Sequence, residues 1–232
     1  MKLKDILKNE WPQLVLLAVP FLVLIPLWDK FPPRVAIHWG LNGQPNGWAD
    51  KEWGLLLMPF TNVGLALLFA FLPHLDSRMR DYGPETKASL EHVLKILRVA
   101  TGIFMAAMAL LIDAVALGWK LDVLRLVTLG MLVLFAVMGN YLPKLRPNRF
   151  VGIRTPWTLQ TPEVWTRTHR LFGSIMLIGS LALFLPCVFL PSSWAVLLLI
   201  AFLLLISLGS MVYSYLCHKS LPLAQNQSVS SK

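Results

Sequence analysis

Charged residues are scarce in this sequence. Asp, Glu, Lys and Arg together make up 14% of its 232 residues, whereas 56% are hydrophobic and the mean hydropathy is +0.62. About a quarter of the residues in a soluble domain are charged, so this chain lacks the side chains that would cover a water-exposed surface. The composition argues against a soluble domain and indicates an integral membrane protein.

Cysteine is nearly absent too, and the spacings typical of catalytic sites are missing. The two cysteines are Cys187 and Cys217. We expect them near opposite faces of a membrane, which argues against a disulfide or a cysteine-based metal site. The sequence contains no glycine-rich loop followed by lysine, no HExxH and no paired-carboxylate or Ser/His/Asp pattern. We therefore expect a protein that is not an enzyme, with no catalytic residues, no cofactor and no metal ion.

Long apolar runs are the dominant feature of the chain. Each is about as long as the ~17–25 residues that a helix needs to cross a bilayer, and Trp or Tyr flanks several of them. The predicted spans are Trp11–Trp28, Gly54–Pro73, Val99–Trp119, Leu124–Leu142, Leu171–Leu190 and Trp194–Leu216. The fourth is the weakest, because Arg125 lies near its start, and without it the termini would lie on opposite sides. We predict an all-α integral membrane protein with six transmembrane helices.

The charge that is present is mostly positive, with a formal net charge of +9. If the amino terminus is inside the cell, the Lys and Arg residues that fall outside are Lys30, Arg34, Lys51, Lys120 and Arg125. All the others are then inside, as the positive-inside rule requires. This asymmetry explains the basic composition without nucleic acid as a direct partner. We expect both termini in the cytoplasm and membrane lipid as a partner of the basic side chains.

The first polar segment covers residues 29–53 and is expected outside the cell. Residues 34–39 alternate between apolar and polar side chains, as in a short strand. Asn42-Gly43 and Asn46-Gly47 supply typical turn residues. We predict a small ordered extracellular cap, although the pattern does not decide whether it is a hairpin. Its candidate binding residues are His38, Trp39, Asn42 and Gly43. His38 is expected to fix the loop, with pH sensing or metal binding as the alternative.

The second polar segment, residues 148–173, is expected in the cytoplasm. Thr161-Pro162-Glu163 is typical of a helix start, and this helix should continue into the fifth span. Trp165, His169 and Phe172 would share one of its faces. We expect His169 to hydrogen-bond a carbonyl group of the neighbouring loop rather than to bind a metal.

The arginines of this segment allow two main interpretations. They are Arg149, Arg154, Arg167 and Arg170. In one interpretation they set the topology and contact anionic lipid headgroups. In the other, residues 148–157 fold back on the Trp165/His169 face and form a surface specific for a partner. Phosphate or nucleotide binding is a third, without a glycine-rich loop to support it.

One acidic residue, Asp113, lies inside the third predicted span. A carboxylate within a membrane is costly and is a functional candidate by default. We expect it to pair with Lys120 or Arg125 near the outer end of the helix. A proton-linked or toxin-linked role is the alternative.

These features divide the chain into three parts. Residues 1–98 form an amino-terminal two-span unit with the extracellular cap and a cytoplasmic amphipathic linker. Residues 99–218 form a four-span unit that contains the cytoplasmic motif 148–173, and residues 219–232 are a polar tail expected to be disordered. The long polar segments after the first span of each half also suggest inverted repeats.

Taken together, the polar segments resemble the SdpI-like family, bacterial immunity proteins against the sporulation-delaying toxin. The resemblance covers about residues 11–216. It rests on Asn148, Gly152-Ile153-Arg154-Thr155-Pro156-Trp157-Thr158, Trp165, Thr168, His169, Arg170 and Gly173. The amino-terminal pattern Pro33, His38, Trp39, Asn42 and Gly43 supports it.

The resemblance implies a multi-pass protein of a bacterial plasma (inner) membrane that binds a secreted antimicrobial peptide toxin and is not catalytic. In the best-known member, the toxin-bound protein also holds a small cytoplasmic transcriptional repressor at the membrane. The motif residues would then serve binding or signalling. We expect an immunity and sensor protein. The alternative is a small transporter or exporter of a peptide or amphipathic compound that uses inverted halves and Asp113.

Overall fold

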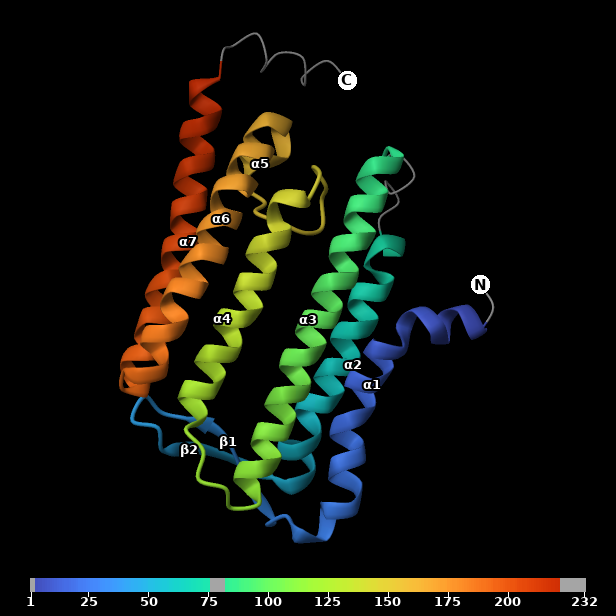
Figure 1. The fold of residues 1–232 in the computed structure, drawn as a ribbon, viewed down its shortest axis with the longest axis vertical. Coiled ribbons are helices and arrows are strands. Elements are labelled where there is room, and N and C mark those ends of the chain that lie inside the picture. Colours follow the sequence, from blue (N-terminus) through green and yellow to red (C-terminus); the bar gives the residue numbers. More distant parts are fainter. Residues whose placement is uncertain (1–2, 76–81, 222–232) are drawn as a thin grey trace.

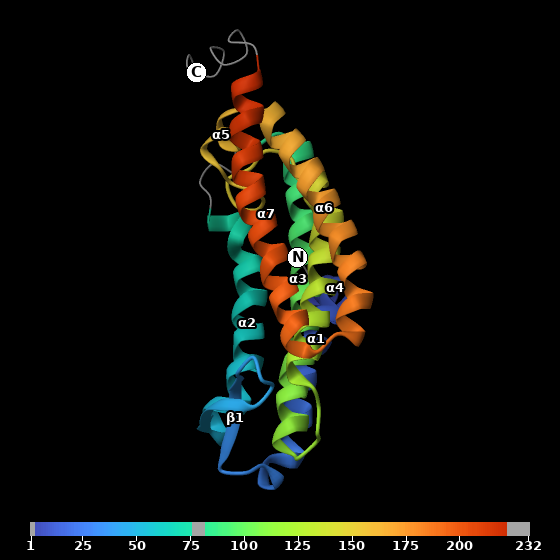
Figure 2. The same cartoon turned by 90° about the vertical axis from the view of Figure 1, so that its left-hand side faces the viewer.

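The computed structural model describes residues 3–75 and 82–221 as a bundle of long helices with a two-stranded hairpin at one end (Figures 1 and 2). Six of its helices are long and apolar enough to cross a membrane. They are α1 (Leu3–Leu27), α2 (Lys51–Leu75), α3 (Pro84–Ala116), α4 (Val123–Tyr141), α6 (Pro162–Phe189) and α7 (Ser192–Ser220). The prediction of a six-span α-helical membrane protein is confirmed, including the weak fourth span.

Packing divides the bundle into two groups of three helices. The first group is α1, α2 and α3, the second is α4, α6 and α7, and α3 packs on α4 between them. The proposed domain boundary after residue 98 falls inside α3, which packs mainly on α1 and α2 and also on α4. At the other end of the chain, α7 continues to Ser220, past the expected start of the tail. The rest of the expected tail, residues 222–232, lies outside the described residues.

The second group is held together by a very close crossing of α4 and α6. A Cβ atom added at Gly139 would lie 2.5 Å from the Leu177 backbone nitrogen and 2.8 Å from the Gly173 carbonyl oxygen. One added at Gly173 would lie 2.6 Å from the Pro143 ring. Glycine at both positions lets the two backbones touch, as small residues do at helix interfaces in membranes.

The first polar segment forms a hairpin of β1 (Arg34–Trp39) and β2 (Pro45–Asp50), preceded by the 3-10 turn η1 (Trp28–Lys30). Its turn depends on Gly43, whose φ of +76° favours glycine. Val35 is 1% exposed and packs with Leu24 and Leu55 at the ends of α1 and α2. The hairpin is therefore anchored on the bundle, and the prediction of a small ordered segment here is confirmed.

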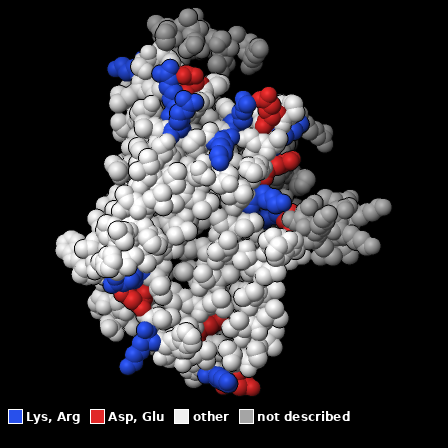
Figure 3. Space-filling model, in the orientation of Figure 1, with Lys and Arg blue, Asp and Glu red and all other residues white. Residues whose placement is uncertain are grey.

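The second polar segment lies at the opposite end of the bundle. It follows the 3-10 turn η3 (Leu142–Lys144) and contains the short helix α5 (Pro156–Gln160), near the carboxyl end of α7 (Figure 1). Most Lys and Arg side chains in Figure 3 gather at this end. The two polar segments are separated by the length of the helices, as segments on opposite faces of a membrane would be. The positive-inside rule then predicts that the α5 end is cytoplasmic.

Cysteine labelling tests this orientation in a chain whose buried cysteines, Cys187 and Cys217, are replaced by alanine. We expect Leu41→Cys, in the hairpin turn, to react with a membrane-impermeant maleimide in intact cells. Gln160→Cys, at the end of α5, should react only after the cells are permeabilised. Both positions are exposed in the fold, so the membrane alone would separate them.

The control for this experiment is Ile178→Cys, which is 66% exposed but lies in the middle of α6. It should stay unlabelled in both conditions, because a residue facing lipid has no water to form the reactive thiolate. Labelling of positions 41 and 160 alike in intact cells would contradict the orientation.

Candidate functional site

The motif residues of the second polar segment gather where the loop 145–155 and α5 fold back onto α6 and α7. Trp165 is at the centre and is 1% exposed. Its indole N–H donates to the Leu145 carbonyl oxygen at 2.8 Å. Its ring packs on Leu90, Val93 and other apolar residues that form a stripe along α3. The loop is thus held against both α6 and α3 by one side chain.

His169 lies one turn after Trp165 and is equally buried. The two rings stack with centroids 4.0 Å apart. The Nδ1 atom is 2.8 Å from the Trp165 carbonyl oxygen, so we assign it the proton. The Nε2 atom then accepts from the Ile153 N–H at 3.0 Å. His169 therefore hydrogen-bonds the loop as expected, but its partner is a loop N–H and not a loop carbonyl. The reason is that the Nδ1–H group of His169 already donates to the Trp165 carbonyl oxygen of its own helix.

Gly152 makes this contact possible. Its φ of +122° favours glycine, and an added Cβ atom would lie 2.4 Å from Nε2 of His169. Just before it, the Asn148 side-chain oxygen accepts from the N–H groups of Phe150 and Val151 at 2.8 and 2.9 Å. Such local bonds to an Asn side chain stabilise a turn. These two motif residues therefore shape the loop.

The following motif residues build α5. Thr155 and Thr158 form a reciprocal capping box, and Pro156 occupies the first turn, where its missing N–H costs nothing. The Thr155 hydroxyl also donates to the Ser214 hydroxyl of α7 at 2.9 Å. Trp157 packs on the Tyr215 ring with centroids 5.1 Å apart. The short helix is thereby tied to α7.

Two further motif residues are also internal. Gly173 provides the close crossing with α4 described above. Thr168 is fully buried, and among the described residues its hydroxyl has no hydrogen-bond partner. Most of the motif that the sequence nominated for binding is therefore used to fold the segment itself.

The exposed part of the motif is its arginines. Arg149, Arg154 and Arg170 are exposed, and their guanidinium groups form no ion pair with any described residue. We call these three the arginine surface. Arg167 instead pairs with Glu163 at 2.6 Å. Next to it, Arg170 lines a shallow groove with Glu163, Ser174 and Tyr213. This surface is the part of the motif that is available to a partner.

At the other end, the hairpin residues show a similar division. His38 is exposed, and its Nδ1 atom hydrogen-bonds the Asn46 side chain across the strands. The Asn42 side-chain oxygen accepts from the Gln44 N–H at 3.1 Å and closes the turn, which Gly43 allows. Trp39 is half-buried at the end of β1. Among the described residues, no group of three or more His, Cys, Asp or Glu side chains could hold a metal ion.

The expected pairing of Asp113 is wrong. Asp113 is 2% exposed, and within the described residues neither carboxylate oxygen has a hydrogen-bond partner. Arg125 instead binds Asp122, the N-cap of α4, at 3.1 Å, and Lys120 is exposed. Burial opposes ionisation of Asp122, but hydrogen bonds from Ser192 and Arg125 lower the pKa of its carboxyl. Arg125 is thus paired with the carboxylate of Asp122, three residues earlier at the start of the same helix.

Sequence reasoning missed a polar link within the amino-terminal helices. Asn62 of α2 is 2% exposed, and its amide donates to the carbonyl oxygens of Leu16 at 3.3 Å and Gly102 at 3.4 Å. It joins α1, α2 and α3. An Asn inside an otherwise apolar run is the signal that could have found it, because such side chains hydrogen-bond across helices in membranes.

Two protein-family models match this chain, and each covers one of the two polar segments. The model of the SdpI/YfhL protein family matches residues 144–214, which include the loop, α5, α6 and most of α7. The model of a domain of unknown function (DUF1648) matches residues 15–63, which include the hairpin. The Immunity protein SdpI of Bacillus subtilis (strain 168) is 24% identical over 217 residues, 93% of this chain and 98% of that protein. No solved structure matches the chain.

The bond between His169 and the loop can be tested by hydrogen exchange. We expect His169→Phe to keep a ring on Trp165 but to remove the acceptor of the Ile153 N–H. Loss of a buried hydrogen-bond partner costs ~1–3 kcal/mol, so exchange in residues 148–158 should become about tenfold faster or more. Mass spectrometry of the purified protein in detergent measures this rate.

The matched control is Arg154→Ala, which changes an exposed side chain of the same loop and should leave the exchange rate as it is in the unchanged protein. If His169→Phe exchanges no faster than this control, the bond does not hold the loop.

Proposed function

We propose that this chain is an SdpI-type membrane protein that protects its cell against a secreted, membrane-active peptide toxin and reports toxin binding to a cytoplasmic partner. The observation that carries the proposal is the similarity to an immunity protein over 93% of the chain, since it includes both the hairpin and the arginine motif. Proteins of this type are not a known enzyme family, so the proposal includes no catalytic step.

The hairpin supports the first half of the proposal, interception of the toxin. Besides His38, it exposes large apolar side chains at one end of the bundle, among them Leu41 and Trp48, with Trp53 just after it. Trp rings favour the headgroup region of a membrane. A membrane-active peptide adsorbs at the same depth. The hairpin would therefore meet such a peptide before it reaches the hydrocarbon region.

The arginine surface supports the second half, the report to a partner. Arg149, Arg154 and Arg170 project from a loop and a helix that are fixed by internal hydrogen bonds. A fixed surface loses little conformational entropy when a partner binds. The unpaired guanidinium groups favour a partner that offers carboxylates, and anionic lipid headgroups are their competitors.

A report of this kind requires that the toxin bind one conformation more tightly than another. A tenfold shift in the equilibrium needs ~1.4 kcal/mol of differential affinity. The helices α4, α6 and α7 run from the loop 145–155 to the hairpin end of the bundle. A toxin bound at the hairpin and a partner bound at the arginine surface could therefore both shift the positions of these helices.

Toxin resistance tests both halves. Cells of a toxin-sensitive bacterium that express the chain should survive a challenge with the peptide toxin. We expect His38→Ala and Arg154→Ala each to lower the tolerated toxin concentration, by about tenfold if ~1.4 kcal/mol of binding or coupling is lost. The minimum inhibitory concentration measures it, with protein levels checked by immunoblot.

The controls are Lys120→Ala at the hairpin end and Lys219→Ala at the α5 end, two exposed lysines outside the proposed surfaces. Both should keep full resistance. The proposal fails if His38→Ala and Arg154→Ala resist the toxin as well as the unchanged protein.

Asp113 favours a second candidate function, transport of a peptide or amphipathic compound. A buried carboxylate without a hydrogen-bond partner among the described residues is typical of ion-linked transporters. For an immunity protein we expect no flux of a fluorescent amphipathic cation into proteoliposomes that contain the chain. Flux that Asp113→Asn abolishes would favour the transporter instead.

A further inference from the structure

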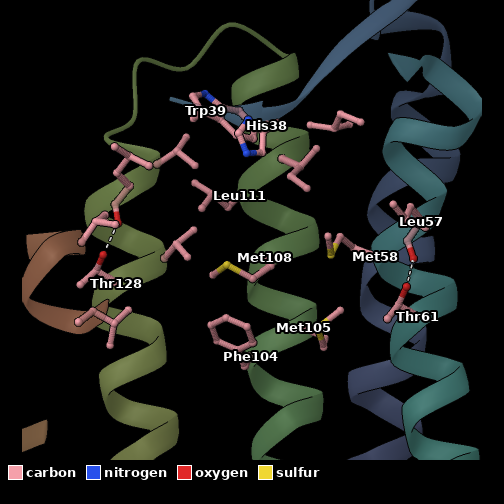
Figure 4. Close-up of a pocket in the computed structure, with 17 residues that line it drawn as sticks. His38, Trp39, Leu57, Met58, Thr61, Phe104, Met105, Met108, Leu111 and Thr128 are labelled. Atoms are coloured by element: carbon pink, nitrogen blue, oxygen red, sulfur yellow. Dashed lines mark hydrogen bonds between the residues drawn. The ribbon is translucent and has the colours of Figure 1, made fainter. Parts of the chain in front are cut away.

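A cavity of about 510 Å³ lies between the two groups of helices, next to the hairpin. Figure 4 shows its lining, which comes from β1, α2, α3, α4 and α7. His38 and Trp39 lie at one end, Leu57 and Met58 line one side, and Met105 and Met108 project from α3. His38 and Trp39 belong to the amino-terminal pattern of the resemblance, but no residue of the motif 148–173 lines this cavity.

The lining is almost entirely apolar. No Asp, Glu, Lys or Arg contributes to it. The hydroxyls of Thr61 and Thr128 donate to carbonyl oxygens of their own helices, Leu57 at 2.7 Å and Leu124 at 2.8 Å, so they do not require a partner in the cavity. Methionine side chains are flexible and adapt to irregular apolar ligands. The interior is therefore suited to hydrocarbon and unsuited to an ion.

The cavity opens at the depth of the membrane. Its rim includes Leu57 and Thr61, which are exposed on α2 within a membrane span. An exposed residue of a span faces lipid when the protein is in a bilayer. The polar imidazole of His38 and the amide of Asn46 lie at the hairpin end, where the headgroup region would be. An occupant should thus be apolar along its length and polar at the hairpin end.

The volume of the cavity distinguishes between two apolar occupants, a thin hydrocarbon chain and a peptide helix. A helix with its side chains is about 10 Å wide and rises ~5.4 Å per turn, so one turn takes up roughly 400 Å³. The cavity would hold little more than one such turn. Its volume is within the ~300–1,000 Å³ of ordinary small-molecule sites, and a single flexible hydrocarbon chain can follow its irregular walls.

We propose that this cavity binds one acyl chain of a membrane lipid, which enters from the bilayer past Leu57 and Thr61 and leaves its headgroup beside His38, Trp39 and Asn46. The indole of Trp39 lies at the boundary between chain and headgroup, the position that Trp favours in membranes. The site shares His38 with the hairpin surface proposed above to meet the toxin, but its lining contains no residue of the motif 148–173. Its test measures lipid contact and not toxin resistance, so the two proposals can fail separately.

Photocrosslinking tests the site in the full chain, reconstituted in liposomes that contain a phosphatidylethanolamine with a diazirine on one acyl chain. We expect crosslinks at Met105 in the unchanged protein. In Met108→Trp, whose larger side chain fills the cavity, crosslinking at Met105 should fall by about tenfold, equivalent to ~1.4 kcal/mol of binding. Mass spectrometry locates the crosslinks, with those at Ile178, which faces lipid on α6, as the reference.

The matched control is Ile103→Trp, on the same helix but 54% exposed and outside the cavity lining. It should leave crosslinking at Met105 as it is in the unchanged protein. Met108→Phe is a second variant in case the Trp variant does not fold. The proposal is overturned if Met105 crosslinks no more than Ile178 in the unchanged protein. It is also overturned if folded Met108→Trp and Ile103→Trp crosslink equally, or if a co-purified peptide occupies the cavity.

Discussion

The loop between α4 and α5 lies against buried side chains, so its backbone groups cannot rely on water for hydrogen bonds. An unpaired backbone group in such a place costs as much as a lost hydrogen bond. α6 meets this requirement with the indole of Trp165 and the imidazole of His169, which bond the Leu145 carbonyl and the Ile153 N–H. The position of the arginine surface follows from these two bonds, because Arg149 and Arg154 belong to the loop that they fix.

The two ends of the bundle are built on the same plan. At each, small turn residues and side-chain hydrogen bonds shape a short irregular segment, and an aromatic side chain anchors or borders it. The fixed parts leave a few polar side chains exposed, His38 at one end and the arginines at the other. A membrane between them would keep their ligands apart, so any communication would have to pass through the helices.

Much of the fold could be predicted from the sequence, because spans and turns are local signals. Long apolar runs fixed the number of helices, and Asn42-Gly43 marked the turn that became a hairpin. Interactions between distant segments were harder to predict. The pairing assigned to Asp113 was wrong because Asp122 lies closer to Arg125. The partner of His169 depends on how a loop 16 residues away in the chain folds back. The apolar cavity has no sequence signal, since its methionines look like those of any core.

The contact of α4 with α6 at Gly139 and Gly173 has a mechanical consequence. Close-packed protein interiors have low compressibility and transmit strain, and two backbones in direct contact leave especially little to compress. Helices α4 and α6 should therefore move together as one rigid body. One end of α4 leads to the loop that carries the arginines, and the other end carries Val123 and Thr128, which lie in the cavity wall. A tilt of this helix pair by a few degrees at one end would displace its other end.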